Sequence, residues 1–177
     1  MTEIPRLYLM VGLPGAGKTT AAQAIADATG AIHIWADDQR RQKFDNPSFD
    51  EAENQSLYAQ LNAETAILLG QGKSVVFDTA FNHYKDRQKL RAIATAHNAR
   101  ALVIWVKTPS QLARQRATEK SDEQATRLLG DMSHEHFDKL KDKLEPPTID
   151  EETIVLDGTK ITKGYVMAKI TNHISPH

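Results

Sequence analysis

The sequence has no cysteine, and its 22 basic and 23 acidic residues leave a formal net charge of −1. Without cysteine, the chain can form no disulfide, no thiolate zinc site and no cysteine nucleophile. Without a strong positive charge, it lacks the overall basic field that drives non-specific binding to nucleic acids, although a local basic patch can still form. The function therefore has to be sought in local motifs.

Long hydrophobic runs are also absent from the sequence. No apolar stretch approaches the roughly 18 residues that a membrane-spanning helix needs, and the first strand-like run starts too early to leave room for a signal peptide. We therefore expect a cytoplasmic protein without a membrane span, and no segment indicates an obligate protein partner. The length of 177 residues suits one domain with a single core, residues 1–177.

The strongest motif is a glycine-rich loop near the N-terminus. Residues 12–19 read Gly-Leu-Pro-Gly-Ala-Gly-Lys-Thr, which fits the phosphate-binding pattern G-x-x-x-x-G-K-[ST]. An apolar run of strand type precedes the loop at residues 6–11, and an alanine-rich helical pattern follows it at residues 18–29. The order strand, loop, helix directs the N-terminus of the helix toward a bound anion. The motif therefore predicts a nucleoside triphosphate site.

Each part of the loop has an expected role in this site. The backbone N–H groups turn toward the polyphosphate, the ammonium group of Lys18 reaches the β- and γ-phosphates, and the hydroxyl of Thr19 binds Mg²⁺. The ATP contacts expected in this loop are Gly12, Leu13, Pro14, Gly15, Ala16, Gly17, Lys18, Thr19 and Thr20.

Strand-like and helical patterns alternate along the chain. Apolar runs predict five strands, at residues 7–11, 31–35, 74–77, 101–106 and 153–156. Helical patterns predict helices at residues 18–29, 51–69, 84–97, 109–118, 133–144 and 163–173. Ser48 with Glu51, and Thr108 with Pro109, have the spacing of helix N-terminal caps. The alternation predicts an α/β fold in which a parallel sheet carries helices on both faces and the ligand lies at the carboxyl ends of the strands.

One acidic residue directly follows the third predicted strand. Asp78 comes after the apolar residues 74–77. A carboxylate in this place suits a residue that helps to hold Mg²⁺, directly or through water, beside Thr19. We therefore expect Asp78 on the metal side of the site, where it can also contact the substrate.

An acidic pair follows the second predicted strand. On an extended segment the side chains of Asp37 and Asp38 would point to opposite sides, so we expect only one of them to face the site. That carboxylate could accept the proton of an attacking hydroxyl, as a catalytic aspartate does in phosphoryl transfer. Arg40 suits a residue that neutralises a substrate anion or orients the base.

Basic residues gather after the fourth predicted strand. Arg114 and Arg116 lie in the helical pattern, and Lys120 and Arg127 follow in a polar stretch. Arginine stabilises the charge on a phosphoryl group during transfer, so both arginines are expected ATP contacts and Arg116 an expected catalytic residue. We expect residues 114–131 to close over the nucleotide as a small lid.

Several segments together resemble a known family. The most specific are Gly-Leu-Pro-Gly-Ala-Gly-Lys-Thr-Thr at residues 12–20, Ala-Asp-Asp-Gln-Arg at 36–40, and Val-Phe-Asp-Thr-Ala at 76–80 followed by Arg87. Residues 112–116 look like the family's entry to the lid, and residues 137–147 followed by Glu151 look like its closing segment. The chain resembles the P-loop kinases that include the 5′-hydroxyl polynucleotide kinase domain, small bacterial kinases and zeta-toxin-like relatives.

The resemblance implies a three-layer P-loop NTPase fold, with a five-stranded parallel sheet in the order 2-3-1-4-5 and a small lid. It implies ATP with Mg²⁺ as the phosphoryl donor, Asp37 as the general base and Arg40 as a contact to the acceptor. The lid arginines would clamp the phosphates. The chain departs from the family pattern in two places, at Thr118-Glu119, where a second lid arginine is common, and at Ala80, where asparagine is common. Both departures concern the lid or the acceptor side.

We therefore predict an ATP-dependent phosphotransferase that acts on an acceptor hydroxyl. The main hypothesis is a polynucleotide-kinase-like enzyme acting on a nucleic-acid 5′ end, which the resemblance favours together with Lys85, Arg87, Lys89 and Arg91 in the third helical pattern. The alternative is a small-molecule or toxin-type kinase, which the near-neutral charge and the short chain favour. A second alternative is a nucleotide-binding regulator with little or no kinase activity.

Overall fold

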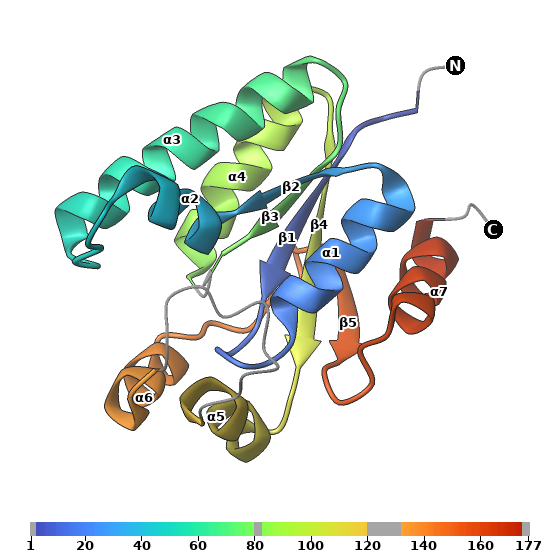
Figure 1. Ribbon diagram of the computed structural model, residues 1–177. Helices are drawn as coiled ribbons and strands as arrows, with labels where there is room; N and C mark the ends of the chain where they lie inside the picture. Colours follow the sequence, from blue (N-terminus) through green and yellow to red (C-terminus); the bar gives the residue numbers. More distant parts are fainter. Residues whose placement is uncertain (1–2, 80–82, 120–131, 175–177) are drawn as a thin grey trace.

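A five-stranded parallel sheet forms the centre of the computed structural model, which describes residues 3–79, 83–119 and 132–174 (Figure 1). The strands are β1 (Arg6–Val11), β2 (Ile32–Trp35), β3 (Val75–Asp78), β4 (Arg100–Lys107) and β5 (Thr153–Asp157). They lie in the order β2-β3-β1-β4-β5, which confirms the order implied by the family resemblance. Every pairing is parallel, so the carboxyl ends of the strands meet at one edge of the sheet.

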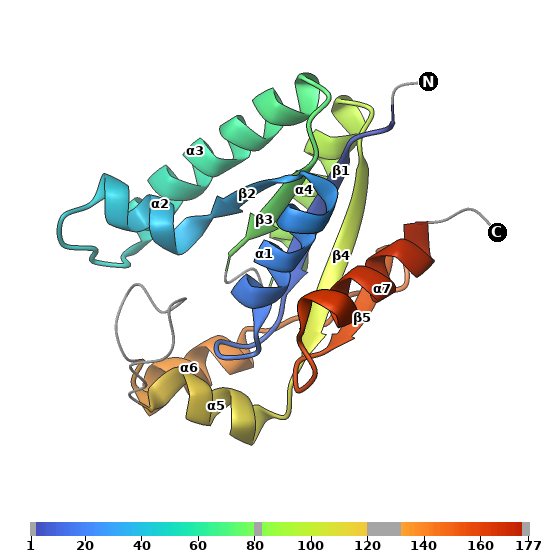
Figure 2. The same ribbon diagram turned by 45° about the vertical axis from the view of Figure 1, so that its right-hand side comes forward.

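Helices cover both faces of this sheet. In the described part of the chain they are α1 (Lys18–Thr29), α2 (Ala36–Lys43), α3 (Glu51–Gly70), α4 (Tyr84–Ala96), α5 (Ser110–Thr118), α6 (His134–Asp142) and α7 (Lys163–Ile174). Helices α1 and α7 pack on one face, and α3 and α4 pack on the other (Figures 1 and 2). Helices α5 and α6 lie beyond the carboxyl ends of the strands, which is where the sequence predicts the nucleotide site.

The two halves of the core follow from the alternation of side chains along β1. Leu7 and Leu9 belong to the cluster with α3 and α4, whereas Tyr8 and Met10 belong to the cluster with α1 and α7. All four are at most 1% exposed. Successive side chains of a strand point to opposite faces, so a strand covered on both sides is apolar at every position. This is why the run appears continuous in the sequence.

Most predicted elements are confirmed to within two residues at each end, but α2 was not predicted. The prediction that Asp37 and Asp38 lie on an extended segment is wrong, because both lie in the first turn of α2. A carboxylate is favoured there by the helix dipole. Only Ala36 and Arg40 are buried in this helix, so no apolar stripe marks it in the sequence.

The predicted cap of α3 is also wrong. The N-cap residue is Asp50, whose carboxylate accepts a hydrogen bond from the N–H of Glu53 at 2.8 Å. Ser48 instead donates its own N–H to the Glu53 carboxylate at 2.6 Å. The cap therefore lies two residues after the expected Ser48, because an aspartate accepts from the first turn as well as a serine does. The bond from Glu53 goes back to Ser48 and not to the N–H of Asp50, so the pair does not form a capping box.

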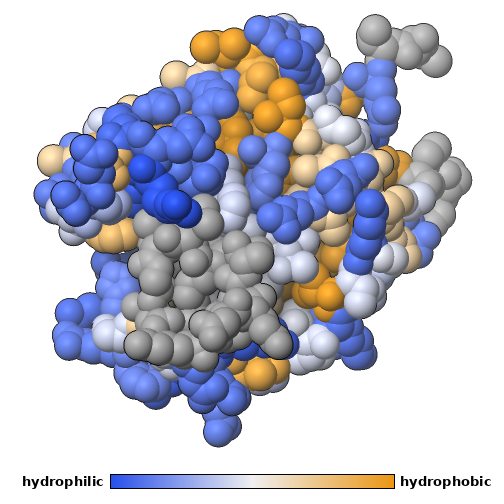
Figure 3. Space-filling model, in the orientation of Figure 1, coloured by the Kyte–Doolittle hydropathy of each residue, from blue (hydrophilic) through white to orange (hydrophobic). Residues whose placement is uncertain are grey.

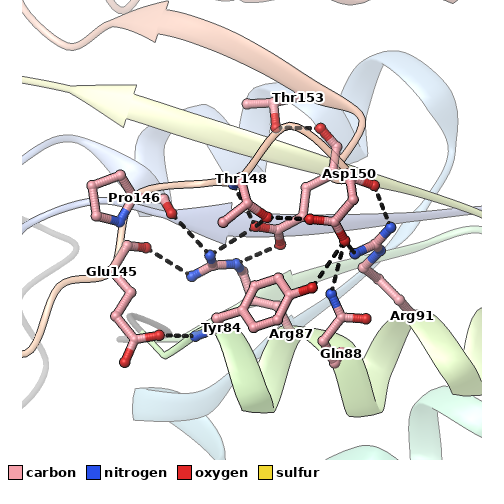
Figure 4. Close-up of polar contacts among 10 residues, drawn as sticks. Tyr84, Arg87, Gln88, Arg91, Glu145, Pro146, Thr148, Asp150 and Thr153 are labelled. Carbon is pink, nitrogen blue, oxygen red and sulfur yellow. Dashed lines mark hydrogen bonds and ion pairs between the residues drawn. The ribbon is translucent and has the colours of Figure 1, made fainter.

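A buried ion pair ties α4 to the segment between α6 and β5 (Figure 4). Arg87 is fully buried and donates from Nε and Nη2 to the two carboxylate oxygens of Glu151, at 2.7 and 2.8 Å. It also donates to the carbonyl oxygens of Glu145 and Pro146, at 3.0 and 3.3 Å. The Glu145 carboxylate in turn accepts from the N–H of Tyr84 at 2.7 Å. These bonds fasten the chain to α4 as it returns from α6 to the sheet.

Replacing Arg87 by methionine should lower the free energy of unfolding by about 3–5 kcal/mol, because the carboxylate of Glu151 would stay buried without its partner. Lys89→Met is the matched control on the same helix. Lys89 pairs with Asp86 at 3.4 Å on the surface, and such exposed pairs contribute about 0–1 kcal/mol. Urea unfolding followed by circular dichroism measures both variants. Equal losses of stability in the two would contradict the structural role of Arg87.

Hydrophilic residues dominate the left side of the surface in Figure 3, where α2 and the start of α3 lie. The large apolar side chains that are exposed come from separate segments, namely Ile4, Phe49, Ile67, Ile149 and Val155. Within residues 3–79, 83–119 and 132–174, no helix combines the length and the apolar character needed to cross a membrane.

Candidate active site

The phosphate-binding loop joins β1 to α1 at the carboxyl edge of the sheet (Figure 1). Gly17 is the N-cap residue of α1, with a φ of 103° and no side-chain hydrogen bond to the helix. A helix start without a side-chain cap leaves N–H groups that suit an anion. The ammonium group of Lys18 donates to the carbonyl oxygens of Gly12 and Leu13, at 2.9 and 2.8 Å. These bonds hold the ammonium group within the curve of the loop.

Helix α5 packs directly against this loop. A Cβ atom on Gly15 would lie 2.2 Å from the carbonyl oxygen of Ala113, so only glycine allows this approach. Thr108 donates its hydroxyl to the carbonyl oxygen of Ala16 at 2.8 Å. The predicted cap of α5 is therefore wrong, since Pro109 is the N-cap residue and makes no side-chain cap. Thr108 supports the phosphate loop instead.

Substituting Gly15 by alanine should weaken nucleotide binding by about tenfold or more, equivalent to about 1.4 kcal/mol, because α5 would be pushed away from the loop. Gly30→Ala is the matched control. The two glycines have φ values of 74° and 71°, so both substitutions carry the same left-handed penalty of about 1–2 kcal/mol. At Gly30, however, a Cβ atom meets nothing within 4 Å. Calorimetric titration with ADP compares the variants, and equal affinities would show that the contact with Ala113 does not matter.

The structure brings Lys18, Asp37 and Asp78 together beside the loop, from the start of α1, the first turn of α2 and the end of β3. Burial lowers the pKa of Lys18, while the charges of Asp78 and Asp37 act to raise it. Loss of hydration and the charge of Asp78 raise the pKa of Asp37, against the effects of Lys18 and Arg40. Asp37 as a whole residue is exposed, so the loss of hydration of its carboxylate is only partial.

Asp78 has a partner that sequence reasoning missed. It is the last residue of β3 and only 3% exposed. Its Oδ2 lies 3.0 Å from Nε2 of His33, which comes from the neighbouring strand β2. The only signal in the sequence was a polar residue inside an apolar strand. This side-chain contact ties the carboxylate at the end of β3 to the neighbouring strand β2.

Thr79 follows Asp78 and was also missed as a candidate. It is 5% exposed, and its hydroxyl oxygen has no hydrogen-bond partner within the part of the chain that the structure describes. The phenol of Tyr58 lies nearby, and burial is the main cause that raises its pKa, but no hydrogen bond of normal geometry joins the two hydroxyls. A buried polar group of this kind suits contact with a ligand.

Arg40 lies on the same helix as Asp37, but its guanidinium group already has partners. It is 5% exposed and forms an ion pair with Glu53. It also donates to Oδ1 of Asn54 at 2.7 Å and lies 4.6 Å from the ring centroid of Phe49. These contacts hold α2 against the start of α3. A direct contact between Arg40 and the acceptor stays a prediction.

The two candidate lid arginines have different surroundings. Arg116 donates to the carbonyl oxygen of Gly158 at 3.1 Å, whereas Arg114 pairs with Asp138 and lies over the ring of Phe137 on α6. Arg116 borders a hollow of about 280 Å³ that is also lined by Gly15, Gly17, Thr20, Gly158, Thr159 and Ile161. Of the two arginines, Arg116 is therefore the one that lines this hollow beside the phosphate loop. Residues 120–131 of the predicted lid, with Lys120 and Arg127, lie outside the described residues.

The donor groups at the loop are compatible with a metal that arrives with the nucleotide. Thr19 follows Lys18 in the first turn of α1, and Asp78 lies close enough to act on the charge of Lys18. Among the residues that the structure describes, no three His, Asp or Glu side chains gather into a metal cluster. Mg²⁺ commonly takes only one or two protein ligands and completes its shell with phosphate and water, so this donor set fits Mg²⁺.

Comparison with known sequences gives a family match. A protein-family profile described as an AAA domain matches residues 7–147, a range that contains the phosphate loop, Asp37 and Asp78. Uncharacterized proteins Rv2004c of Mycobacterium tuberculosis and Mb2027c of Mycobacterium bovis are each 31% identical over 107 residues, which covers 53% of this chain. The match spans only 22% of the length of these relatives.

Comparison with solved structures concerns the fold alone, because the sequence identities are low. A sugar kinase from Janibacter sp. HTCC2649 has a TM-score of 0.70 at 17% identity, covering 97% of this chain and 95% of that one. A gluconokinase from Sinorhizobium meliloti 1021 has a TM-score of 0.68 at 17% identity, covering 96% and 90%. A chain of the Pnkp1/Rnl/Hen1 RNA repair complex has a TM-score of 0.66 at 20% identity, covering 81% and 45%. The fold is that of the P-loop kinases.

Proposed function

Because the chain belongs to the AAA domain family and has the fold of a P-loop kinase, we propose that it transfers the γ-phosphoryl group of ATP to a hydroxyl of a small molecule. The observation that carries this proposal is the meeting of Lys18, Asp37 and Asp78 at the phosphate loop. Phosphoryl transfer commonly uses a lysine at the phosphates, a carboxylate that acts as the base, and a second carboxylate on the metal side. These three groups are present here beside a helix N-terminus.

The proposed reaction assigns one task to each group. Asp37 accepts the proton of the acceptor hydroxyl while that oxygen bonds to the γ-phosphorus, and the bond from phosphorus to the β–γ bridging oxygen breaks to release ADP. A raised pKa makes the Asp37 carboxylate a stronger base than an ordinary aspartate. Lys18 and the loop N–H groups hold the phosphates, and Arg116 stabilises charge from the side of the hollow. Mg²⁺, when bound, would neutralise the phosphate oxygens, with Thr19 and Asp78 as the residues that would hold it, directly or through water.

A small-molecule acceptor fits the structure better than a nucleic-acid end. The basic side chains of α4, which favoured a polynucleotide, are largely engaged: Arg87 is buried against Glu151, and Arg91 pairs with Asp150 at 2.8 Å. On the acceptor side, Arg40 is neutralised by Glu53, while the buried hydroxyl of Thr79 is a group that could bind another hydroxyl. The sugar kinase and the gluconokinase also share the fold over nearly the whole chain.

The polynucleotide hypothesis retains one supporting observation, the likeness to a chain of the RNA repair complex. The two hypotheses differ in their response to salt. Binding to a polyanion weakens steeply as salt concentration rises, because counterions are released, whereas binding to a neutral polyol does not. A regulator without kinase activity would instead show nucleotide binding and no acceptor-dependent turnover.

A panel of hydroxyl acceptors with labelled ATP tests the proposal. The panel contains neutral sugars and polyols, sugar acids, nucleosides, and DNA and RNA oligonucleotides with 5′-hydroxyl ends. We expect labelled product only with members of the sugar and polyol classes, at a rate that depends little on salt. Labelling of the oligonucleotides with a steep salt dependence would overturn the small-molecule assignment. Binding of MgATP without transfer to any acceptor would favour the regulator.

A further inference from the structure

His33 is the only ionisable residue of the short strand β2. Its imidazole Nε2 lies 3.0 Å from Oδ2 of Asp78. The register pairs His33 with Val76 and Trp35 with Asp78, so the imidazole extends forward along the sheet to meet the carboxylate. The rings of His33 and Trp35 stack at 5.9 Å with an interplanar angle of 7°, which limits the rotation of the imidazole.

The chemistry of the contact determines which group donates. An ionised carboxylate can only accept hydrogen bonds, so toward such a carboxylate Nε2 of His33 acts as the N–H donor. The Asp78 side chain is 3% exposed and the His33 side chain 17% exposed, so water competes little for this bond. A buried carboxylate with one oxygen held in this way keeps a single orientation. The contact with His33 involves Oδ2 alone and leaves Oδ1 of Asp78 for other partners.

We propose that His33 is a positioning residue, which holds the carboxylate of Asp78 in the orientation that a magnesium nucleotide requires. This inference rests on the proposed function, because it assigns Asp78 to the metal side of the phosphate site. The charged groups around Asp78 are Lys18 at the start of α1 and Asp37 on α2. The negative charge of Asp78 acts on both groups, so the orientation of its carboxylate affects their electrostatic environment. Partners that orient a metal-side carboxylate commonly change metal affinity or activity by about 10–100-fold when they are removed.

Two substitutions separate the hydrogen bond from the packing of the ring. His33→Phe keeps an aromatic ring against Trp35 but removes the donor. His33→Gln loses the ring but places an amide N–H close to the position of Nε2. Isothermal titration calorimetry with ADP, repeated over a series of Mg²⁺ concentrations and without Mg²⁺, measures the metal-dependent part of nucleotide binding. Thermal unfolding of each variant controls for loss of structure.

We expect His33→Phe to raise the Mg²⁺ concentration for half-maximal nucleotide binding by about 10–100-fold, while ADP binding without Mg²⁺ stays at the wild-type level. His33→Gln should return the Mg²⁺ requirement toward that of the wild type. Unchanged Mg²⁺ dependence in a folded His33→Phe variant would overturn the inference. So would equal defects in the two variants. If His33→Phe does not fold, His33→Asn takes its place, because its shorter side chain cannot reach Asp78.

The binding experiment also separates this inference from the proposed function. It needs no acceptor, so a wild-type protein that binds ADP in a Mg²⁺-dependent way can support the role of His33 even if the acceptor panel finds no transfer. Conversely, normal transfer by the wild type together with a normal Mg²⁺ requirement in His33→Phe would overturn only the inference about His33.

Discussion

Replacing Asp37 by asparagine should slow acceptor-dependent transfer by about 10²- to 10⁴-fold, the range that a general base contributes. Asparagine keeps the shape of the side chain but cannot take up the proton of the acceptor hydroxyl. Asp37 stands in the first turn of α2, within reach of the charges of Lys18 and Asp78. The KM for MgATP should change little, because the expected nucleotide contacts lie on the phosphate loop and α5. Steady-state kinetics with the best acceptor from the panel measures both constants.

Asp38 provides the matched control for this prediction. It is the neighbouring carboxylate in the same turn of α2, but its Oδ2 accepts a hydrogen bond from the side chain of Gln42 at 2.7 Å. Asp38→Asn should therefore leave the transfer rate close to that of the wild type. If Asp38→Asn abolishes transfer and Asp37→Asn retains it, the base has been assigned to the wrong carboxylate.

Lys18→Ala should reduce kcat by about 10²- to 10³-fold, the usual cost of losing one group that stabilises charge in the transition state. It should also weaken nucleotide binding, because the ammonium group both meets the phosphates and holds the loop through the carbonyl oxygens of Gly12 and Leu13. Calorimetry with MgADP measures the second effect independently of any acceptor.

Lys73→Ala is the control for the loss of a positive charge. Lys73 is exposed in the connection between α3 and β3, at the opposite edge of the sheet from the phosphate loop. Its removal should change neither kcat nor nucleotide affinity. A Lys18→Ala variant that is folded and as active as Lys73→Ala would contradict the proposed site, and so would a wild-type protein with no affinity for magnesium nucleotides.

Much of the fold could be predicted because its signals are local. The continuous apolar run of β1 and the glycine-rich pattern at residues 12–19 specify a strand, a loop and a helix start within a few residues of one another. The parallel sheet followed from the alternation of strands and helices, and the strand order from the family resemblance. Helix α2 escaped prediction because it is short and buries only Ala36 and Arg40, so its pattern contains no apolar period.

The candidate site could be predicted only in part, because the partners of its residues are distant in sequence. Arg40 appeared available to a substrate, yet Glu53 and Asn54 of α3 occupy its guanidinium group. Arg87 appeared to be one of several surface cations, yet it is buried against Glu151, 64 residues away. The contact of His33 with Asp78 joins two strands at residues that are 45 positions apart in the sequence. No local pattern contains such pairings.

The sequence by itself determined the glycine-rich loop of the proposed nucleotide site, because the form of this loop depends on glycine conformations within a single stretch of chain. The tertiary structure alone decided which charges remain available to a substrate and which are neutralised. That outcome depends on burial and on the order in which the strands assemble, because a charge taken out of water has to find a partner wherever the fold places one.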